Sequence, residues 1–75
     1  TQDAYKSAFG RNVDQFRKEC GWTFELLAEK VSFDKTTVLA HVRAGAKPRP
    51  RTSKAYAEIF TIALGRPISV SDLES

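Results

Sequence analysis

The sequence contains one cysteine, one histidine and no methionine, and each shortage excludes a class of protein. Because Cys20 is the only cysteine, the chain cannot form an internal disulfide, which excludes a disulfide-stapled secreted domain. One cysteine and one histidine also cannot supply the four ligands of a structural zinc site. Without a methionine, Thr1 is not a natural start, so we expect the chain to be an excised domain.

Long apolar runs are missing as well. No run comes near the ~18 residues that a membrane-spanning helix needs, and the first residues show no signal-peptide pattern. We therefore expect no membrane partner. A single unpaired thiol is typical of a reducing compartment, so we expect a cytoplasmic location.

The combinations of side chains that carry catalysis are also absent from the sequence. There is no carboxylate pair, no Ser-His-Asp set, no phosphate-cradling glycine loop and no group of residues at metal-ligand spacing. The 75 residues predict one domain, 1–75, with little area for a deep pocket. The sequence therefore predicts a protein that is not an enzyme, with no cofactor and no small-molecule substrate.

Charged residues make up an ordinary 28% of the chain and the net charge is only +3, but the charges are unevenly placed. None of the nine acidic residues lies between residues 35 and 57, and this window holds six of the twelve bases: Lys35, Arg43, Lys47, Arg49, Arg51 and Lys54. A cationic stretch of this kind is either a solvated basic loop or a site for a polyanion. The second interpretation requires a motif that places the stretch beside a groove-reading element.

Capping residues divide the chain into four predicted helices. Asp3 and Thr23 are the expected N-caps of the first two, Asp34 of the third, and Thr52 or Ser53 of the fourth. The segment 46–52 is expected to be irregular, because its two prolines lack amide donors and disfavour the helical region in the residues before them.

Glycines mark the expected helix ends, and apolar spacing marks the inward faces. Gly21, Gly45 and Gly65 are expected to end the first, third and fourth helices. Gly10 is expected to weaken the first by about 1 kcal/mol relative to alanine, so that this helix frays or begins later than Asp3. Ser69 and Asp72 resemble a capping box for a last short turn. The sets with helical spacing are Tyr5, Phe9, Val13, Phe16 and Cys20, then Phe24, Leu27, Ala28 and Val31, then Val38 and Val42 with His41 beside them, then Tyr56, Ile59, Phe60, Ala63 and Leu64. No strand alternation appears, so the predicted fold is an all-α, compact bundle of about five short helices.

Only about three residues, 32–34, join the second and third predicted helices, and this spacing is typical of a helix-turn-helix. The stretch 21–43, GWTFELLAEKVSFDKTTVLAHVR, resembles the Cro/lambda-repressor-like (XRE) helix-turn-helix family. The resemblance rests on Gly21, the Leu27-Ala28 pair, Val31, the capping residue at 34 and the Thr37-Val38 pair. The closing stretch from Ala63 to Leu73 is similar to that family's last helices, so the resemblance covers about residues 9–74.

The resemblance implies a five-helix bundle that binds double-stranded DNA as a transcriptional regulator, often as a homodimer on a palindromic site. Carried over by position, Lys35, Thr36 and Ala40 would face base edges. The contacts with the DNA backbone would come from Thr23 and Phe24 before and at the start of the second helix, and from Lys47, Arg49 and Arg51 after the third.

The residues themselves extend this set of expected contacts. Lys35 suits guanine O6 and N7, and Leu39 is either an apolar contact to a thymine methyl or no contact. Thr37 lies one residue round from the reading face and is expected to be structural or to touch a phosphate. The same cationic window adds Arg43 and Lys54 to the expected backbone contacts.

Other conspicuous residues are expected to pack rather than react. His41, Trp22 and Cys20 are interpreted as packing residues. Leu26 stands where related chains commonly have a polar residue, so it is a candidate apolar contact with a partner or a second copy. The non-polar Leu39 and Ala40 keep a second function open, in which the chain is a helix-turn-helix protein-interaction or targeting module of a larger protein.

Overall fold

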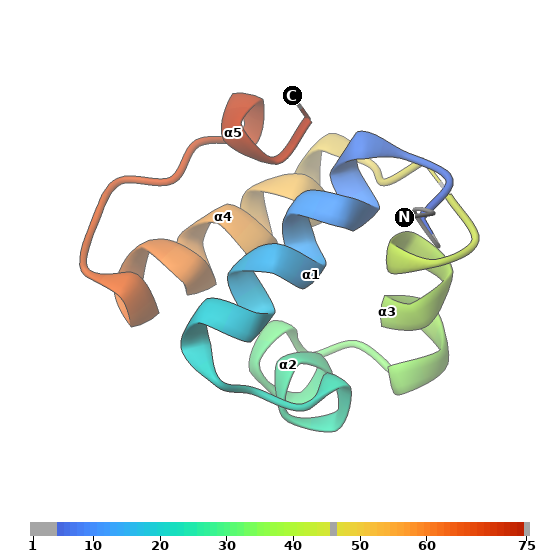
Figure 1. The fold of residues 1–75 in the computed structure, drawn as a ribbon, viewed down its shortest axis with the longest axis horizontal. Coiled ribbons are helices and arrows are strands. Elements are labelled where there is room, and N and C mark those ends of the chain that lie inside the picture. The colour runs from blue at the N-terminus through green and yellow to red at the C-terminus, as the bar shows by residue number, and fades with distance from the viewer. Residues whose placement is uncertain (1–4, 46, 75) are drawn as a thin grey trace.

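The computed structural model describes residues 5–45 and 47–74, and these residues contain five helices and no strand. The helices are α1 (Ala8–Cys20), α2 (Phe24–Val31), α3 (Lys35–Val42), α4 (Pro50–Leu64) and α5 (Val70–Glu74). The predicted all-α bundle is therefore confirmed. In Figure 1, α1 crosses the middle of the molecule and α3 stands at one end, and α1 packs against α3, α4 and α5.

The first helix begins later than its apolar spacing predicts. Ser7 is its N-cap, and the Ser7 hydroxyl oxygen accepts a hydrogen bond from the Gly10 amide at 3.1 Å. The predicted cap, Asp3, lies outside the described residues. The helix ends as predicted at Gly21, which has a φ of 73° and whose amide bonds to the Lys18 carbonyl.

The two short helices α2 and α3 are joined by Ser32–Asp34. Thr23 caps α2 as predicted, since its hydroxyl oxygen accepts a hydrogen bond from the Leu26 amide at 3.1 Å. Ser32 ends α2 in the left-handed region at φ 62°, and the next amide, of Phe33, bonds to the Ala28 carbonyl at 2.9 Å. Asp34 occupies the N-cap position of α3, but its side chain makes no capping hydrogen bond.

The fourth helix begins three to four residues earlier than predicted, at Pro50, with Arg49 in the N-cap position. The prediction that 46–52 is irregular is therefore wrong for residues 50–52, and Thr52 and Ser53 are not the cap. The physical reason is that Pro50 occupies the first helical position. There a missing amide donor breaks no intrahelical bond, and the fixed φ of proline already suits the helix.

The core lies where α1, α2, α3 and α4 meet, and α5 closes it. Its fully buried side chains include Val13, Leu27, Val38, Tyr56, Phe60 and Leu73. Most of the predicted inward faces are confirmed, but Ala63 is exposed and Ala57 is buried in its place. The C-terminal end of α4 therefore does not bury the face that the sequence predicted, and Ile62, which follows Thr61, is exposed there.

The chain from α4 to α5 is held by side chains at both ends. The Thr61 hydroxyl accepts from the Ile68 amide at 2.9 Å and donates to the Ile68 carbonyl at 3.2 Å. The predicted capping box is confirmed, since the Ser69 amide donates to Asp72 at 2.9 Å and the Asp72 amide donates to Ser69 at 3.2 Å. Among the described helices, none has the length and apolar character needed to cross a bilayer.

Candidate nucleic-acid interface

The four side chains predicted to face base edges lie along α3. Lys35 and Thr36 are exposed in its first turn, whereas Leu39 and Ala40 are half-buried in its second. The polar pair is therefore more accessible to solvent than the apolar pair. Thr37 is also exposed.

An aromatic cluster fixes α3 against the rest of the bundle. The His41 ring meets the rings of Phe9, Phe33 and Tyr56 edge-on, at centroid distances of 6.3, 6.2 and 5.8 Å. His41 Nδ1 lies 3.1 Å from the Tyr56 hydroxyl, so the two polar groups satisfy each other. Burial lowers the pKa of His41, because it disfavours the charged form of the ring. The predicted packing role of His41 is confirmed.

Close contact between α1 and α3 depends on Gly10. A Cβ atom at this position would lie 2.3 Å from the Val42 carbonyl oxygen and 2.9 Å from the His41 carbonyl oxygen. Both atoms belong to the backbone and cannot turn aside. Beyond its expected cost to the helix, Gly10 therefore has a packing role that the sequence did not predict, because its missing side chain lets the C-terminal end of α3 rest on α1.

Two guanidinium groups contact the Phe24 ring at the start of α2. The guanidinium carbon of Arg17 is 4.2 Å from the ring centroid, and that of Arg43 is 5.4 Å away. Phe24 is half-buried, and its ring offers a flat surface to the two guanidinium groups. The ring thereby holds Arg43, from the end of α3, beside the N-terminus of α2.

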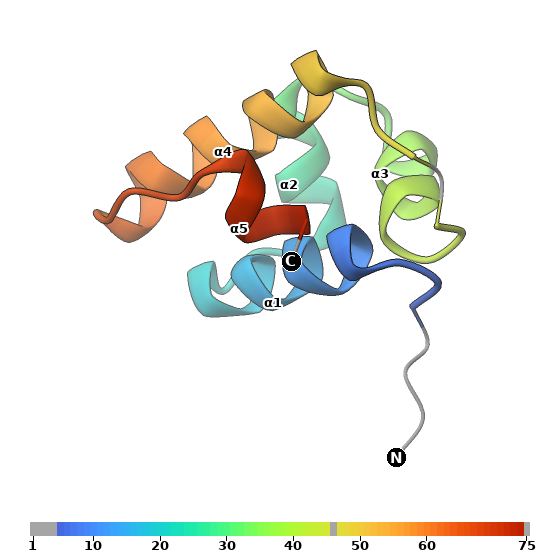
Figure 2. The same ribbon diagram turned by 90° about the horizontal axis from the view of Figure 1, so that it is seen from above.

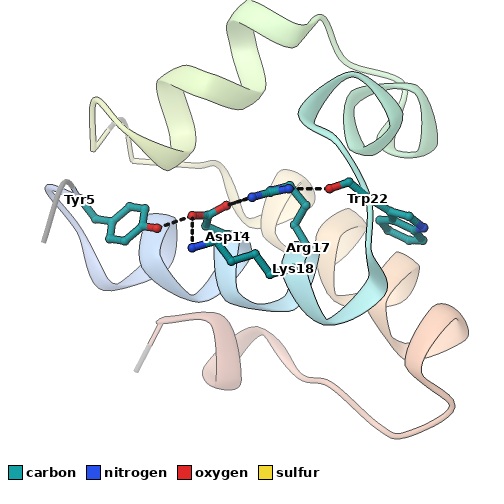
Figure 3. A network of polar contacts seen from close by, with 5 residues as sticks. All are labelled: Tyr5, Asp14, Arg17, Lys18 and Trp22. Atoms are coloured by element: carbon teal, nitrogen blue, oxygen red, sulfur yellow. Dashed lines mark hydrogen bonds and ion pairs between the residues drawn. The ribbon is translucent and has the colours of Figure 1, made fainter.

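A buried carboxylate, Asp14, holds Arg17 in place (Figure 3). It forms an ion pair with Arg17 at 2.7 Å, accepts a hydrogen bond from the Tyr5 hydroxyl and lies 3.5 Å from the Lys18 ammonium. Arg17 in turn donates to the Trp22 carbonyl in the turn between α1 and α2. Burial alone would raise the pKa of Asp14, but the hydrogen bonds from Tyr5 and Arg17, with the two positive charges, outweigh it and lower the pKa.

Replacing Asp14 with asparagine is expected to destabilise the fold by about 2–4 kcal/mol at pH 7, because it leaves the Arg17 charge without its partner. Since the pKa of Asp14 is lower in the folded chain than its usual 3.8, its contribution is complete above that value. The contribution is lost as the pH falls below it. Urea unfolding at pH 7, 5 and 3 measures this. Lys18→Ala, which removes an exposed partner, should cost under about 1 kcal/mol, and equal losses for both variants would contradict the account.

An acidic side chain of α2 forms an ion pair with the first residue of α3. The Lys35 ammonium is 3.4 Å from Glu25 in the first turn of α2, and both side chains are largely exposed. The pair links the beginnings of α2 and α3. An exposed pair of this kind contributes little to stability, so it opens readily when another anion competes for the lysine.

The residues after α3 form a cationic segment, which we define as Lys47, Arg49, Arg51 and Lys54. All four are exposed, and none is ion-paired with an acid within residues 5–45 and 47–74. Figure 2 shows the start of α4 toward the end of the molecule that α3 occupies, and Figure 1 shows that it lies near the C-terminal end of α3, away from the turn between α2 and α3. Ala46, the first residue of the predicted 46–52 loop, lies outside the described residues.

The structure also brings in residues that the sequence interpretation did not assign to the interface. Gly10 lets α3 pack closely on α1, the Arg17 guanidinium lies over the Phe24 ring, and Glu25 forms an ion pair with Lys35. A glycine inside a strongly amphipathic helix is a signal for close approach, and it was available in the sequence. The Arg17 and Glu25 contacts depend on how the three helices cross and have no local signal. Thr23, by contrast, is exposed where expected, with its hydroxyl oxygen already used as a cap.

Trp22 packs as predicted, stacking on Phe60 with ring centroids 6.0 Å apart. The part of the chain that the structure describes holds no group of three or more His, Cys, Asp or Glu side chains placed to bind a metal ion. Comparison of this chain with known protein families, curated proteins and solved structures found no match.

Proposed function

We propose that this chain is a helix-turn-helix domain that binds double-stranded DNA, with α3 in the major groove and the cationic segment on the phosphates. A major groove about 12 Å wide admits an α-helix. The N-terminal turn of α3 presents Lys35 and Thr36 to the base edges. The positive N-terminal ends of α2 and α3 favour phosphate oxygens on either side.

The observation that carries the proposal is the coincidence of two features at one end of the molecule. The exposed start of α3 lies at one end of this helix, and the cationic segment, which makes no ion pair within the described residues, follows the other end of the same helix (Figure 1). A solvated basic loop alone does not require a neighbouring exposed helix. A DNA site requires both, since phosphate contacts set the affinity and base contacts set the specificity.

The likeness of 21–43 to the Cro/lambda-repressor-like family extends the proposal to regulation. A chain of that kind acts as a transcriptional regulator in the cytoplasm of a bacterium or a phage-infected cell. The preferred site would then be palindromic, with half-sites about 10 base pairs apart for a pair of chains. Selection from random duplex DNA tests this directly, and enrichment of no motif would contradict sequence-specific binding.

The roles proposed for Lys35 and Arg49 differ, so their alanine variants should differ. Lys35→Ala is expected to weaken binding to the selected site by about 1–3 kcal/mol and to relax one base position. Arg49→Ala should weaken binding to selected and random duplexes equally, because a phosphate carries no sequence information. Competition titrations with both duplexes measure the difference. Equal effects of the two variants on every duplex would show that the assignment of base and backbone roles is wrong.

The Glu25–Lys35 pair is expected to restrain binding. Glu25→Gln removes a negative charge from the interface and releases the Lys35 ammonium, so affinity for any duplex should rise about three- to tenfold at low salt. Glu58→Gln is the matched control, because it removes the same charge from α4, away from the groove-reading residues. The same titration measures both variants. Equal gains in affinity would mean that net charge alone is responsible, and the pair would have no role.

A protein-interaction or targeting module is the second candidate function, and exposed Leu26 and Ile62 favour it. Chemical-shift perturbation separates the two candidates. DNA binding should move the amides of residues 35–40 together with those after α3. Shifts limited to the surroundings of Leu26 or Ile62 in the presence of a partner protein, with none from DNA, would favour the second candidate.

A further inference from the structure

Arg43 differs from the other bases of the 35–57 window because an aromatic ring lies beside its charge. Its guanidinium carbon is 5.4 Å from the centroid of the Phe24 ring, a distance at which a cation and a ring attract each other. Within residues 5–45 and 47–74, no ring lies under the window's other bases: Lys35, Lys47, Arg49, Arg51 and Lys54. Arg43 is exposed, and none of the ion pairs of these residues includes it. It is therefore a charge that is held in place without being neutralised.

The contact between Arg43 and Phe24 joins the end of α3 to the beginning of α2. Arg43 is the C-cap of α3, and its amide donates to the Leu39 carbonyl at 2.7 Å, whereas Phe24 is the first residue of α2. The backbone at Arg43 is thereby fixed, and only its side chain is left to be ordered. Immobilising a side chain with many rotamers on binding costs affinity. The ring restricts the freedom of this side chain before a ligand arrives.

The Phe24 ring is itself held from the α1 side. It packs partly against the core, and the guanidinium carbon of Arg17 lies 4.2 Å from its centroid. Two guanidinium groups at one ring repel each other, but Asp14 forms an ion pair with Arg17 at 2.7 Å and compensates its charge. Arg43 has no acid of this kind, so its charge is the one that is left for an external anion.

We propose that Phe24 is a positioning residue, which holds the Arg43 guanidinium in place for a phosphate group of the duplex. This assignment rests on the proposed DNA binding, and it adds a phosphate contact separate from the cationic segment. The sequence predicts that Phe24 itself touches the DNA backbone. Phosphate oxygens are contacted by hydrogen-bond donors, and a phenyl ring has none, so the ring acts through Arg43. Because less entropy is lost on binding, Phe24 raises the affinity without adding a charge.

The salt dependence of binding distinguishes a positioning residue from a residue that contacts phosphate. Arg43→Ala should weaken binding to a duplex of random sequence about fivefold near 0.1 M salt and make the log–log salt slope smaller in magnitude by about 0.9, because one phosphate is no longer neutralised. Phe24→Leu should weaken binding about threefold with an unchanged slope, since the same number of phosphates is neutralised. Phe24→Tyr keeps the ring and should bind like the parent chain. Fluorescence anisotropy with a labelled duplex at several salt concentrations measures both quantities.

Phe16→Leu is the matched control. The guanidinium carbon of Arg66 lies 5.8 Å from the centroid of the half-buried Phe16 ring, but Arg66 is paired with Glu19 at 2.9 Å. Arg66 follows the C-terminal end of α4, which lies at the opposite end of the molecule from α3 (Figure 1). This variant also loses a ring beside an arginine, and it should keep the affinity and the slope of the parent chain. Urea unfolding checks that every variant is folded under the conditions of the titration.

A double variant decides whether the ring acts through Arg43. In a chain that carries Arg43→Ala, the additional change Phe24→Leu should have no effect on affinity. A further loss in that background overturns the assignment, as does a Phe24→Leu variant that binds like the parent chain or has a smaller salt slope. A parent chain that binds no duplex overturns the proposed DNA binding together with this assignment. Binding by the parent chain with independent effects of the two substitutions overturns the assignment alone.

Discussion

Removing three charges from the cationic segment should weaken binding to every duplex by about 100-fold near 0.1 M salt. In the triple variant Lys47→Ala, Arg49→Ala and Arg51→Ala, each lost phosphate contact removes the release of about one counterion. The slope of the log of the association constant against the log of the salt concentration should therefore become smaller in magnitude by about 2.7. The three side chains are exposed and make no ion pair within the described residues, so the fold should be unaffected. Fluorescence anisotropy with labelled duplexes at several salt concentrations measures both quantities.

A control with the same net charge distinguishes position from total charge. Lys18, Lys30 and Arg66 are three bases outside the 35–57 window, and replacing them with alanine removes the same charge. This variant should lose less than about tenfold in affinity, because long-range attraction is screened beyond a Debye length of about 10 Å at 0.1 M salt. If both triple variants lose affinity to the same extent, binding depends on net charge and the segment is not a site.

Replacing Gly10 with alanine should lower the free energy of unfolding by about 2–3 kcal/mol, although alanine is the better helix former. The added Cβ would lie 2.3 Å from the Val42 carbonyl oxygen, so α1 and α3 would have to separate. The separation would tilt α3 and move Lys35. Urea unfolding measures the stability, and the DNA titration of the folded variant measures the effect on binding.

Two controls isolate the contact from general effects of alanine. Gln15→Ala, on the exposed side of the same helix, should change the stability by less than about 0.5 kcal/mol. Gly65→Ala should cost about 1 kcal/mol, because Gly65 has a φ of 68° but nothing within 4 Å of its missing Cβ. If Gly10→Ala is neutral or stabilising, the two helices do not approach each other as described.

Local signals in the sequence sufficed for most of the fold. Thr23, Gly21 and the Ser69–Asp72 box act on amides within a few residues of themselves, so their roles were predictable and are confirmed. The error at Pro50 had a different origin. Proline breaks a helix at an interior position and is favoured at the first position. Which of the two roles Pro50 has depends on the direction from which the preceding chain enters the helix.

The parts of the site that escaped prediction depend on contacts between helices. Tyr5 belongs to the apolar spacing of α1, yet it lies before that helix and donates its hydroxyl to Asp14. Asp14 is spaced like a surface residue one position after Val13, but it is buried with Arg17. No local pattern in the sequence indicates a buried ion pair, because both partners are polar and only the packing of the helices removes them from water.

The central claim is that this chain holds several DNA phosphates while α3 reads the groove. A titration of the parent chain with duplex DNA from about 50 to 300 mM salt tests it most directly. If four to five phosphates are neutralised, the log of the association constant should fall with the log of the salt concentration with a slope of about −4 per chain. A slope near zero, or no binding at the lowest salt, would contradict the claim.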